Sequence, residues 1–443
     1  MKREKLKWST IISYALAYGS GYQIMGSLVG AYLMIFLTDT FGVPAAAVGV
    51  ITVVASIWDA VNDPMMGAIA DRTNTRWGKY RPYFLFVPAA LTVVVVLLFA
   101  NPNIGTTGKI IWTAVFYVLY GMLRTAIEIP SGALINAVTD EPSERNKMIN
   151  AYTMVMGICT TIATSFGLSL VSFFGGKNTS KGYMIVVGIA GVLMTITCWL
   201  CFATTKETCI KETEKKPLLE EIKTLFRVKG LLYTILVWIA AYISYCVMMS
   251  SSVYYIMYCL CRPDLISVIG LLGIIIVIPV FLKIFKKTEK AFAASQVIVA
   301  ISSIIIIIFK ENIAVIFVCS GIASMFATAS MPFSAMIMTE MTDMILLDSG
   351  RIMNGTMAAL KGFSNKAGIA AANAAVSFTL AATGYIANAV GKEPQAVING
   401  ITAVRFVVPA VCAIVIILAL FKYPVTAEKR RKIGKLYEKG QEK

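Results

Sequence analysis

Two aspartates, Asp59 and Asp63, stand four residues apart in the apolar stretch IWDAVNDPMMG, and Asn62 lies between them. On a helix, positions i and i+4 share a face and i+3 lies beside them, so the three polar side chains project together. Two close carboxylates in a hydrocarbon environment repel each other unless one holds a proton or a cation lies between them. Hard cations prefer oxygen ligands. The spacing therefore predicts a site for Na⁺ or H⁺, and the alternative is that a lysine pairs with the aspartates.

Lys361 is the lysine available for such a pair, and it lies in the apolar stretch AALKGFSNKAG. An ammonium group at membrane depth needs an anionic neighbour or a watery cavity. We hypothesise that Lys361 neutralises the carboxylates when the cation is absent and yields when the cation binds. Lys361 would then couple cation binding to the other half of the chain.

A second pair of charges, Arg124 and Glu128, has the same spacing in YGMLRTAIEIPSGAL. The two side chains can neutralise each other within one helix. Alternatively they face a watery cavity and bind a solute, where Glu128 accepts hydrogen bonds from hydroxyls and Arg124 donates to hydroxyls or a carboxylate. The adjacent Thr125 can complete the oxygen ligands of the cation.

An aromatic stripe, Tyr14, Tyr18 and Tyr22, is followed by Gln23. Such a stripe is typical of packing or of an interfacial anchor. It also suits a sugar, because the apolar face of a sugar ring stacks on aromatic rings. Both interpretations stay open from the sequence.

The composition indicates an integral membrane protein. The chain has 443 residues, of which 58% are hydrophobic and 14% charged, whereas soluble domains are about 45–50% apolar. Its nine cysteines lie mostly in apolar segments, which favours buried thiols over a disulfide framework. The absence of histidine excludes imidazole chemistry, and no nucleophile–base pair or metal-ligand cluster indicates an enzyme. The formal charge of +16 does not predict nucleic-acid binding here. The distribution of the lysines and arginines along the chain indicates how the protein is oriented in the membrane.

Twelve apolar windows are long enough to cross a bilayer. They lie near 10–37, 47–70, 83–100, 110–137, 148–174, 183–203, 231–258, 264–282, 292–309, 313–342, 353–388 and 400–422. If both termini lie in the cytoplasm, few lysines and arginines lie on the opposite side of the membrane, as the positive-inside rule requires. They are Lys109, Lys177, Lys181, Arg262, Lys310 and Lys392. The sequence thus predicts a multi-pass protein of the cell membrane with two six-helix bundles, 1–203 and 231–422, a charged linker, 204–230, and a basic tail, 423–443, lying on anionic lipid.

The stretch IWDAVNDPMMGAIADRTNTRWGKYRP, together with EIPSGAL, MTDMILLDSGR and LKG further along, resembles the glycoside–pentoside–hexuronide:cation symporter family of the major facilitator superfamily. The resemblance covers both halves of the chain. It implies an all-α major facilitator fold and symport by alternating access. In the melibiose carrier type, Na⁺ or H⁺ is held by two aspartates, an asparagine and a threonine, with a lysine nearby. The matching positions here are Asp59, Asn62, Asp63, Thr125 and Lys361.

The solute side departs from the melibiose carrier type, which disfavours a melibiose-like galactoside. A Lys–Asp pair is replaced by GSGYQ at 19–23, an aspartate by Glu128, a tryptophan by Gly132 and an arginine by Thr153. Arg124, where that carrier has a tyrosine, leaves room for an anionic solute such as a hexuronide. The residues expected to bind solute are Tyr18, Tyr22, Gln23, Arg124, Glu128 and Thr153.

The basic loop at 67–82 is expected to serve conformational switching through ion pairs and helix-end contacts. The residues expected to do so are Asp71, Arg72, Arg76, Lys79 and Arg81. A loop that only orients the protein is the alternative.

We expect a glycoside, pentoside or hexuronide as solute, Na⁺ ahead of H⁺ as the coupled cation, and membrane lipid as the surroundings. The alternative solute is a lipid-like molecule or an organic anion. We expect no cofactor and a monomer.

Overall fold

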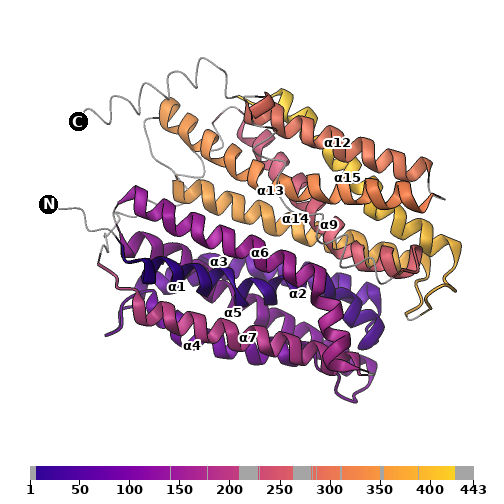
Figure 1. The fold of residues 1–443 in the computed structure, drawn as a ribbon, viewed down its shortest axis with the longest axis horizontal. Helices are drawn as coiled ribbons and strands as arrows, with labels where there is room; N and C mark the ends of the chain where they lie inside the picture. The colour runs from indigo at the N-terminus through magenta and orange to yellow at the C-terminus, as the bar shows by residue number, and fades with distance from the viewer. Residues whose placement is uncertain are drawn as a thin grey trace. The chain divides into compact units, whose positions relative to one another are not determined.

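The structure of the protein is a computed structural model, and it describes residues 6–139, 141–176, 178–208, 228, 230–262, 281, 283–285, 287–309, 312–349, 354–387 and 389–424. Within these residues the regular elements are helices (Figure 1), and an isolated β-bridge joins Thr75 and Gly78 in a loop. The predicted all-α fold class is confirmed.

The elements are α1 (Trp8–Gly19), α2 (Gly21–Ile35), the π-helical turn η1 (Phe36–Thr40), α3 (Ala45–Arg72), α4 (Arg81–Leu98), α5 (Thr106–Val138), α6 (Pro142–Gly175), α7 (Thr179–Thr204), α9 (Leu231–Tyr254), the π-helical turn η2 (Tyr255–Cys259), α12 (Thr288–Ile308), α13 (Ile313–Ser349), α14 (Asn354–Thr383) and α15 (Gln395–Phe421).

In the described part of the chain, 10 helices are long and apolar enough to cross a membrane, counting Trp8–Thr40 as one. The predicted window 353–388 corresponds to α14, which carries Lys361 and Lys366 and is not among those 10. Apart from Phe281, the predicted window 264–282 lies outside the described residues, as does most of the predicted linker 204–230. The observed helices are therefore consistent with twelve spans.

The chain forms two compact units. The first contains Met1–Glu212, Ile256–Leu271 and Leu380–Pro394, and the second contains Thr213–Tyr255, Leu272–Thr379 and Gln395–Lys443. The helices α1 to α7 thus pack together in the first unit. Most of η2, which follows α9, and the end of α14 are also part of it.

The first predicted span is broken at Ser20, whose φ of −97° and ψ of −105° are not helical. Glycines flank the break because neighbouring backbone comes too close for a side chain. A Cβ at Gly21 would lie 2.3 Å from the backbone nitrogen of Met194, and one at Gly19 would lie 2.9 Å from the carbonyl oxygen of Tyr152. The sequence GSG therefore lets this span press against α6 and α7.

The helix α3 packs against α5, and its two sides differ in exposure. Ile57, Val61 and Met65 form a stripe of exposed apolar side chains, with exposed fractions of 64%, 51% and 50%. Asn62, by contrast, is buried. Since an apolar exposed stripe suits lipid, the polar residues of α3 are turned toward the interior of the first unit.

The second unit is centred on a buried cluster around Trp238, whose indole nitrogen donates to the carbonyl oxygen of Ser334 at 3.1 Å. In the same unit α14 approaches α9 closely at Gly368, where a Cβ would lie 2.5 Å from the Tyr242 side chain. Arg405 of α15 is fully buried, and its guanidinium donates to the Met248 carbonyl oxygen and the Ser252 hydroxyl, each at 2.8 Å. Hydrogen bonds thus make a buried arginine tolerable inside this unit.

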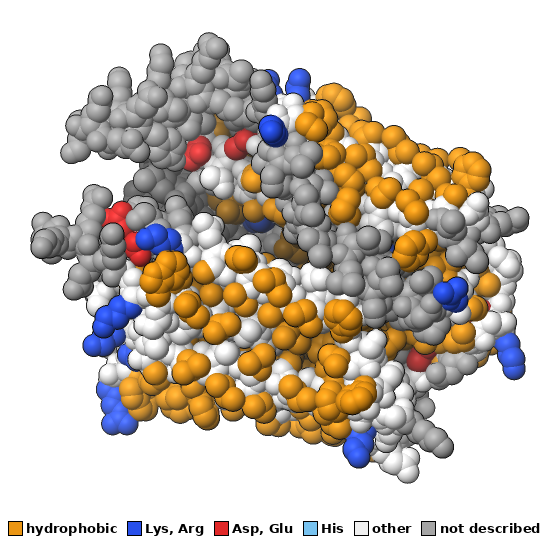
Figure 2. Space-filling model, in the orientation of Figure 1, with side chains coloured by type: hydrophobic (Ala, Val, Ile, Leu, Met, Phe, Trp, Pro, Cys, Tyr) orange, Lys and Arg blue, Asp and Glu red, His pale blue; other side chains and the backbone are white. Residues whose placement is uncertain are grey.

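The surface fits a bilayer environment. Figure 2 shows hydrophobic side chains over the middle of the helices in the lower part of the view, with Lys and Arg side chains at the edges. Among the most exposed large apolar side chains are Phe173 of α6 and Phe421 of α15, whose exposed fractions are 81% and 82%. Side chains of this kind are stable on a surface that faces lipid.

Candidate functional site

The predicted cation residues of α3 lie against α5 in the first unit. The Thr125 hydroxyl donates to the Asp63 carboxylate at 3.0 Å. The Asp59 carboxylate lies beside Gly121, where a Cβ would be only 2.7 Å from its Oδ1. Both aspartates are half-buried. Each carboxylate therefore faces the neighbouring helix and not the exposed stripe of α3.

Asn62 completes this group of polar side chains. It is 6% exposed, and its amide nitrogen has no hydrogen-bond partner among the described residues. An amide nitrogen donates hydrogen bonds and does not bind cations, so the atom that Asn62 offers to a cation is its amide oxygen. Two carboxylates, an amide and a hydroxyl form a donor set that fits a hard cation.

A Gly121→Ala substitution is expected to weaken sodium binding on the order of tenfold. The added Cβ would lie 2.7 Å from Asp59 Oδ1, so the carboxylate would have to move out of its position, and a tenfold loss of affinity corresponds to about 1.4 kcal/mol. Calorimetric sodium titration of the purified variant measures the effect. Gly132→Ala on the same helix is the matched control, because a Cβ there meets nothing within 4 Å. Equal sodium affinities in the two variants would contradict the placement of Asp59 in the site.

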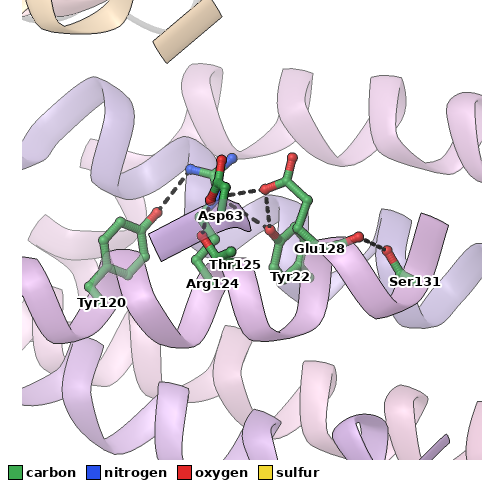
Figure 3. Close-up of polar contacts among 7 residues, drawn as sticks. All are labelled: Tyr22, Asp63, Tyr120, Arg124, Thr125, Glu128 and Ser131. Carbon is green, nitrogen blue, oxygen red and sulfur yellow. Dashed lines mark hydrogen bonds and ion pairs between the residues drawn. The ribbon is translucent and has the colours of Figure 1, made fainter. Parts of the chain in front are cut away.

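The guanidinium of Arg124 lies among three side chains (Figure 3). Its Nε donates to the Tyr22 hydroxyl and one of its terminal nitrogens donates to the Tyr120 hydroxyl, each at 3.2 Å. The Tyr22 hydroxyl in turn donates to Glu128 at 3.2 Å. These contacts join α2 to α5 and present two opposite charges side by side.

Arg124 and Glu128 do form the intrahelical pair considered from the sequence, at 3.6 Å. The two side chains are 41% and 50% exposed, so the pair is open on one side. An exposed pair of this kind contributes little to stability, about 0–1 kcal/mol. Its charges are thus accessible for hydrogen bonds with a solute.

The other predicted solute residues lie on α1, α2 and α6. Tyr18 stacks on Tyr22 across the break at Ser20, with ring centroids 4.9 Å apart, and also contacts the Tyr152 ring edge at 5.3 Å. The Gln23 amide donates to Thr160 at 2.9 Å. The exposed Thr153 hydroxyl donates to the Ile149 carbonyl oxygen of its own helix at 2.8 Å. The tyrosines thus adjoin the Arg124 group, whereas Gln23 and Thr153 are held by contacts with α6.

A small crevice adjoins Arg124. Its lining residues are Tyr22, Met25, Gly26, Leu91, Tyr120 and Arg124. Two of these residues, Tyr22 and Tyr120, are also the tyrosines that accept hydrogen bonds from the Arg124 guanidinium.

Lys361 lies on α14 in the second unit and is half-buried. No hydrogen bond or ion pair of its ammonium is found within the described part of the chain. The coupling role of Lys361 stays a prediction.

The family model described as "MFS/sugar transport protein" matches residues 14–427. The chain belongs to this family. Within the family, the inner membrane symporter YicJ of Escherichia coli is 28% identical over 93% of this chain and 90% of that protein. The glucuronide carrier protein homologue of E. coli is 27% identical over 97% of this chain and 95% of that protein. The fold is similar to the solved structure of a bacterial homologue of the human lysosomal transporter Spinster, with a TM-score of 0.67 and 15% sequence identity. The match covers 94% of this chain and 97% of the Spinster homologue.

These comparisons confirm the glycoside–pentoside–hexuronide:cation symporter resemblance and the major facilitator fold. This chain is a multi-pass membrane transporter and not an enzyme. The solved structure is too distant in sequence to show more than the fold.

The basic loop of this facilitator holds the start of the linker. The carboxylate of Glu207 accepts hydrogen bonds from three consecutive backbone N–H groups, those of Lys79, Tyr80 and Arg81, at 2.7, 2.8 and 2.8 Å. The Arg81 side chain donates to the Phe202 carbonyl oxygen near the end of α7, with Nε at 3.2 Å. A carboxylate at the start of α4 also suits the positive end of the helix dipole.

Two of the other predicted switch residues lie at the protein surface. Arg72 and Arg76 are exposed, and the Arg76 guanidinium lies 4.4 Å from the centre of the Trp77 ring. The Lys79 ammonium lies over the Tyr80 ring at 5.4 Å. The side chain of Asp71 lies outside the described residues. The switching role of this loop stays a prediction.

A Gly78→Ala substitution is expected to destabilise this facilitator by about 2 kcal/mol or more. Gly78 has φ of +113°, which costs other residues about 1–3 kcal/mol. The added Cβ would also lie 2.8 Å from Glu207 Oε1. Thermal unfolding in detergent measures the loss, with Gly67→Ala of α3 as the control because a Cβ there meets nothing within 4 Å. Equal melting temperatures for the two variants would contradict both the backbone strain at position 78 and the importance of the Glu207 contact.

Three contributors to this region were not singled out from the sequence. Tyr120 lies four residues before Arg124, so the helical spacing alone could have found it. Gly121 and Glu207 gave no signal, because their roles depend on the close approach of α3 to α5 and on the fold of the loop before α4.

Proposed function

We propose that this facilitator is a symporter that couples the movement of Na⁺ to uptake of a sugar or sugar acid by alternating access. Asp59, Asn62, Asp63 and Thr125 bind the cation, and Lys361 conveys its presence to the second half of the chain. H⁺ is the second candidate for the coupled cation. The protein lies in the cell membrane as a monomer, with both termini in the cytoplasm.

The observation that carries the proposal is the position of the aspartates on α3. Asp63 accepts a hydrogen bond from Thr125, and Asp59 presses against Gly121, so both carboxylates lie against α5. Four oxygen-bearing residues in this arrangement favour Na⁺, because a proton needs only one carboxylate.

The solute site is proposed around Arg124. Glu128 accepts hydrogen bonds from sugar hydroxyls, and Tyr18 offers its ring face beside Tyr22. Arg124 can bind the carboxylate of a sugar acid in a bidentate manner. The name of the E. coli glucuronide carrier homologue supports a sugar acid. Gln23 of α2, which donates to Thr160 of α6, and Thr153 of α6 form the side of the site next to α6.

An organic anion or a lipid-like solute is the second candidate. The crevice beside Arg124 is also lined by Met25 and Leu91, and this apolar lining favours a solute with an apolar body and an anionic group. Tryptophan fluorescence titration with sugars, sugar acids and fatty acids separates the candidates.

Uptake into proteoliposomes tests the proposed function. A radiolabelled glucuronide or pentoside is added under an inward sodium gradient, an inward proton gradient or no gradient. We expect accumulation under the sodium gradient that collapses when a sodium ionophore is added. Uptake that responds to neither gradient would overturn the proposal.

A further inference from the structure

Asp39 lies in η1, at the end of the first span, and accepts hydrogen bonds from two tyrosines. Its Oδ2 accepts from the Tyr258 hydroxyl, and its Oδ1 accepts from the Tyr385 hydroxyl at 2.5 Å. The Thr38 hydroxyl donates to the same Oδ1 at 2.7 Å. Hydrogen bonds to an ionised acceptor are roughly twice as strong as those between neutral groups.

The two tyrosines come from parts of the chain far from Asp39 in sequence. Tyr258 lies in η2, which follows α9, and Tyr385 follows α14. Both tyrosines belong to the first compact unit, although all of α9 and most of α14 belong to the second. The tyrosine rings meet edge to face at 5.2 Å, so both hydroxyls reach one carboxylate. Asp39 therefore holds two helix ends from the second half of the sequence.

Glu393 stabilises the loop that carries Tyr385. Its Oε1 accepts the backbone N–H of Ile386 at 3.3 Å, and the residue is only 9% exposed. Burial and the nearby negative charge of Asp39 raise the pKa of the Glu393 carboxyl. The loop is thus folded around Tyr385, close to the Asp39 carboxylate.

The three segments share one side of the membrane in the proposed topology. Each follows an odd-numbered span, the first, the seventh and the eleventh, so each lies opposite the basic cytoplasmic loops. We propose that Asp39, Tyr258 and Tyr385 form an outer gate, which must open each time the solute site is exposed to the outside. This inference rests on the proposed transport by alternating access.

The chemistry of the cluster suits a gate that opens repeatedly. Both tyrosines donate hydrogen bonds while keeping their protons, so opening requires no proton transfer. Water can replace both donors once the carboxylate is exposed, which keeps the cost of opening moderate. Two simultaneous bonds to one charged acceptor nevertheless favour the closed state.

Labelling of a cysteine at position 30 tests the gate. Gly30 of α2 lies four residues after Gly26, which lines the crevice beside Arg124, and a Cβ at Gly30 meets nothing within 4 Å. Gly30→Cys therefore places a thiol on the same helix face, one turn nearer to Asp39. A membrane-impermeant maleimide is added to intact cells, and peptide mass spectrometry separates this thiol from the native cysteines.

Tyr258→Phe combined with Tyr385→Phe is expected to raise the labelling rate about tenfold, since two bonds to a charged acceptor are lost. Asp39→Asn is a second variant and is expected to raise the rate to a lesser extent. Tyr32→Phe is the matched control, because the Tyr32 hydroxyl donates at 2.6 Å to the Thr164 carbonyl oxygen, within the first half of the sequence. It should leave the rate unchanged.

Unchanged labelling in both gate variants, or equal acceleration in Tyr32→Phe, would overturn the proposal. The measurement requires neither sodium nor solute. Failure of sodium coupling in proteoliposomes would therefore leave the labelling result intact, and the two proposals can fail separately.

Discussion

An Asp63→Asn variant is expected to lose sodium-driven uptake by about 100-fold or more, because a carboxylate about 4 Å from a unit positive charge contributes about 4 kcal/mol at an effective dielectric constant near 20. The amide keeps the size of the side chain and its hydrogen bond from Thr125 but removes the charge. Initial rates of solute uptake in proteoliposomes, measured across a series of sodium concentrations, give the size of the effect.

Thr125 offers a matched pair of controls for this prediction. Thr125→Ser keeps the hydroxyl that donates to Asp63, whereas Thr125→Val has the same shape without it. The serine variant should remain sodium-dependent and the valine variant should not. Full sodium-driven uptake in both Asp63→Asn and Thr125→Val would mean that the cation binds elsewhere.

An Arg124→Gln variant is expected to reduce solute uptake on the order of 10- to 100-fold while leaving sodium binding intact. The substitution removes a cation that contacts Tyr22, Tyr120 and Glu128, and hydrogen bonds to charged groups contribute about 1.5–3 kcal/mol each. Uptake kinetics and sodium titration on the same preparation separate the two effects.

Tyr120→Phe is the milder companion of this variant. It removes one hydrogen bond to Arg124 and keeps the guanidinium, so its uptake should fall by a smaller factor. If Arg124→Gln instead abolished sodium binding and left solute uptake unaffected in proton-driven assays, Arg124 would belong to the cation site.

Much of the fold could be predicted from hydrophobicity alone. The exposed stripe of Ile57, Val61 and Met65 and the opposite placement of Asp59 and Asp63 follow from helical periodicity, which is a local property. The same periodicity placed Arg124 and Glu128 on one helix face, where they form a pair.

Contacts between distant parts of the chain could not be predicted in this way. The break at Ser20 depends on how closely α7 approaches Gly21. Glu207 and Asp39 are carboxylates whose partners lie far away in sequence, and nothing in their neighbours signals this. Buried Arg405 illustrates the same limit, since its serine and carbonyl partners come from other helices.

The family resemblance and the geometry contribute different parts of the account. The family model indicates a transporter of the sugar-transport family. The contacts of Asp63 with Thr125, and of Asp59 with Gly121, show how α3 and α5 bring polar groups together. The Arg124 group suits both a sugar acid and another organic anion.

Calorimetric titration of the purified protein with sodium chloride, with choline chloride as the ionic-strength control, tests the cation site most directly. The account predicts saturable sodium binding in the unaltered protein and none in a chain carrying both Asp59→Asn and Asp63→Asn. Sodium binding of unchanged affinity in the doubly substituted protein would contradict it.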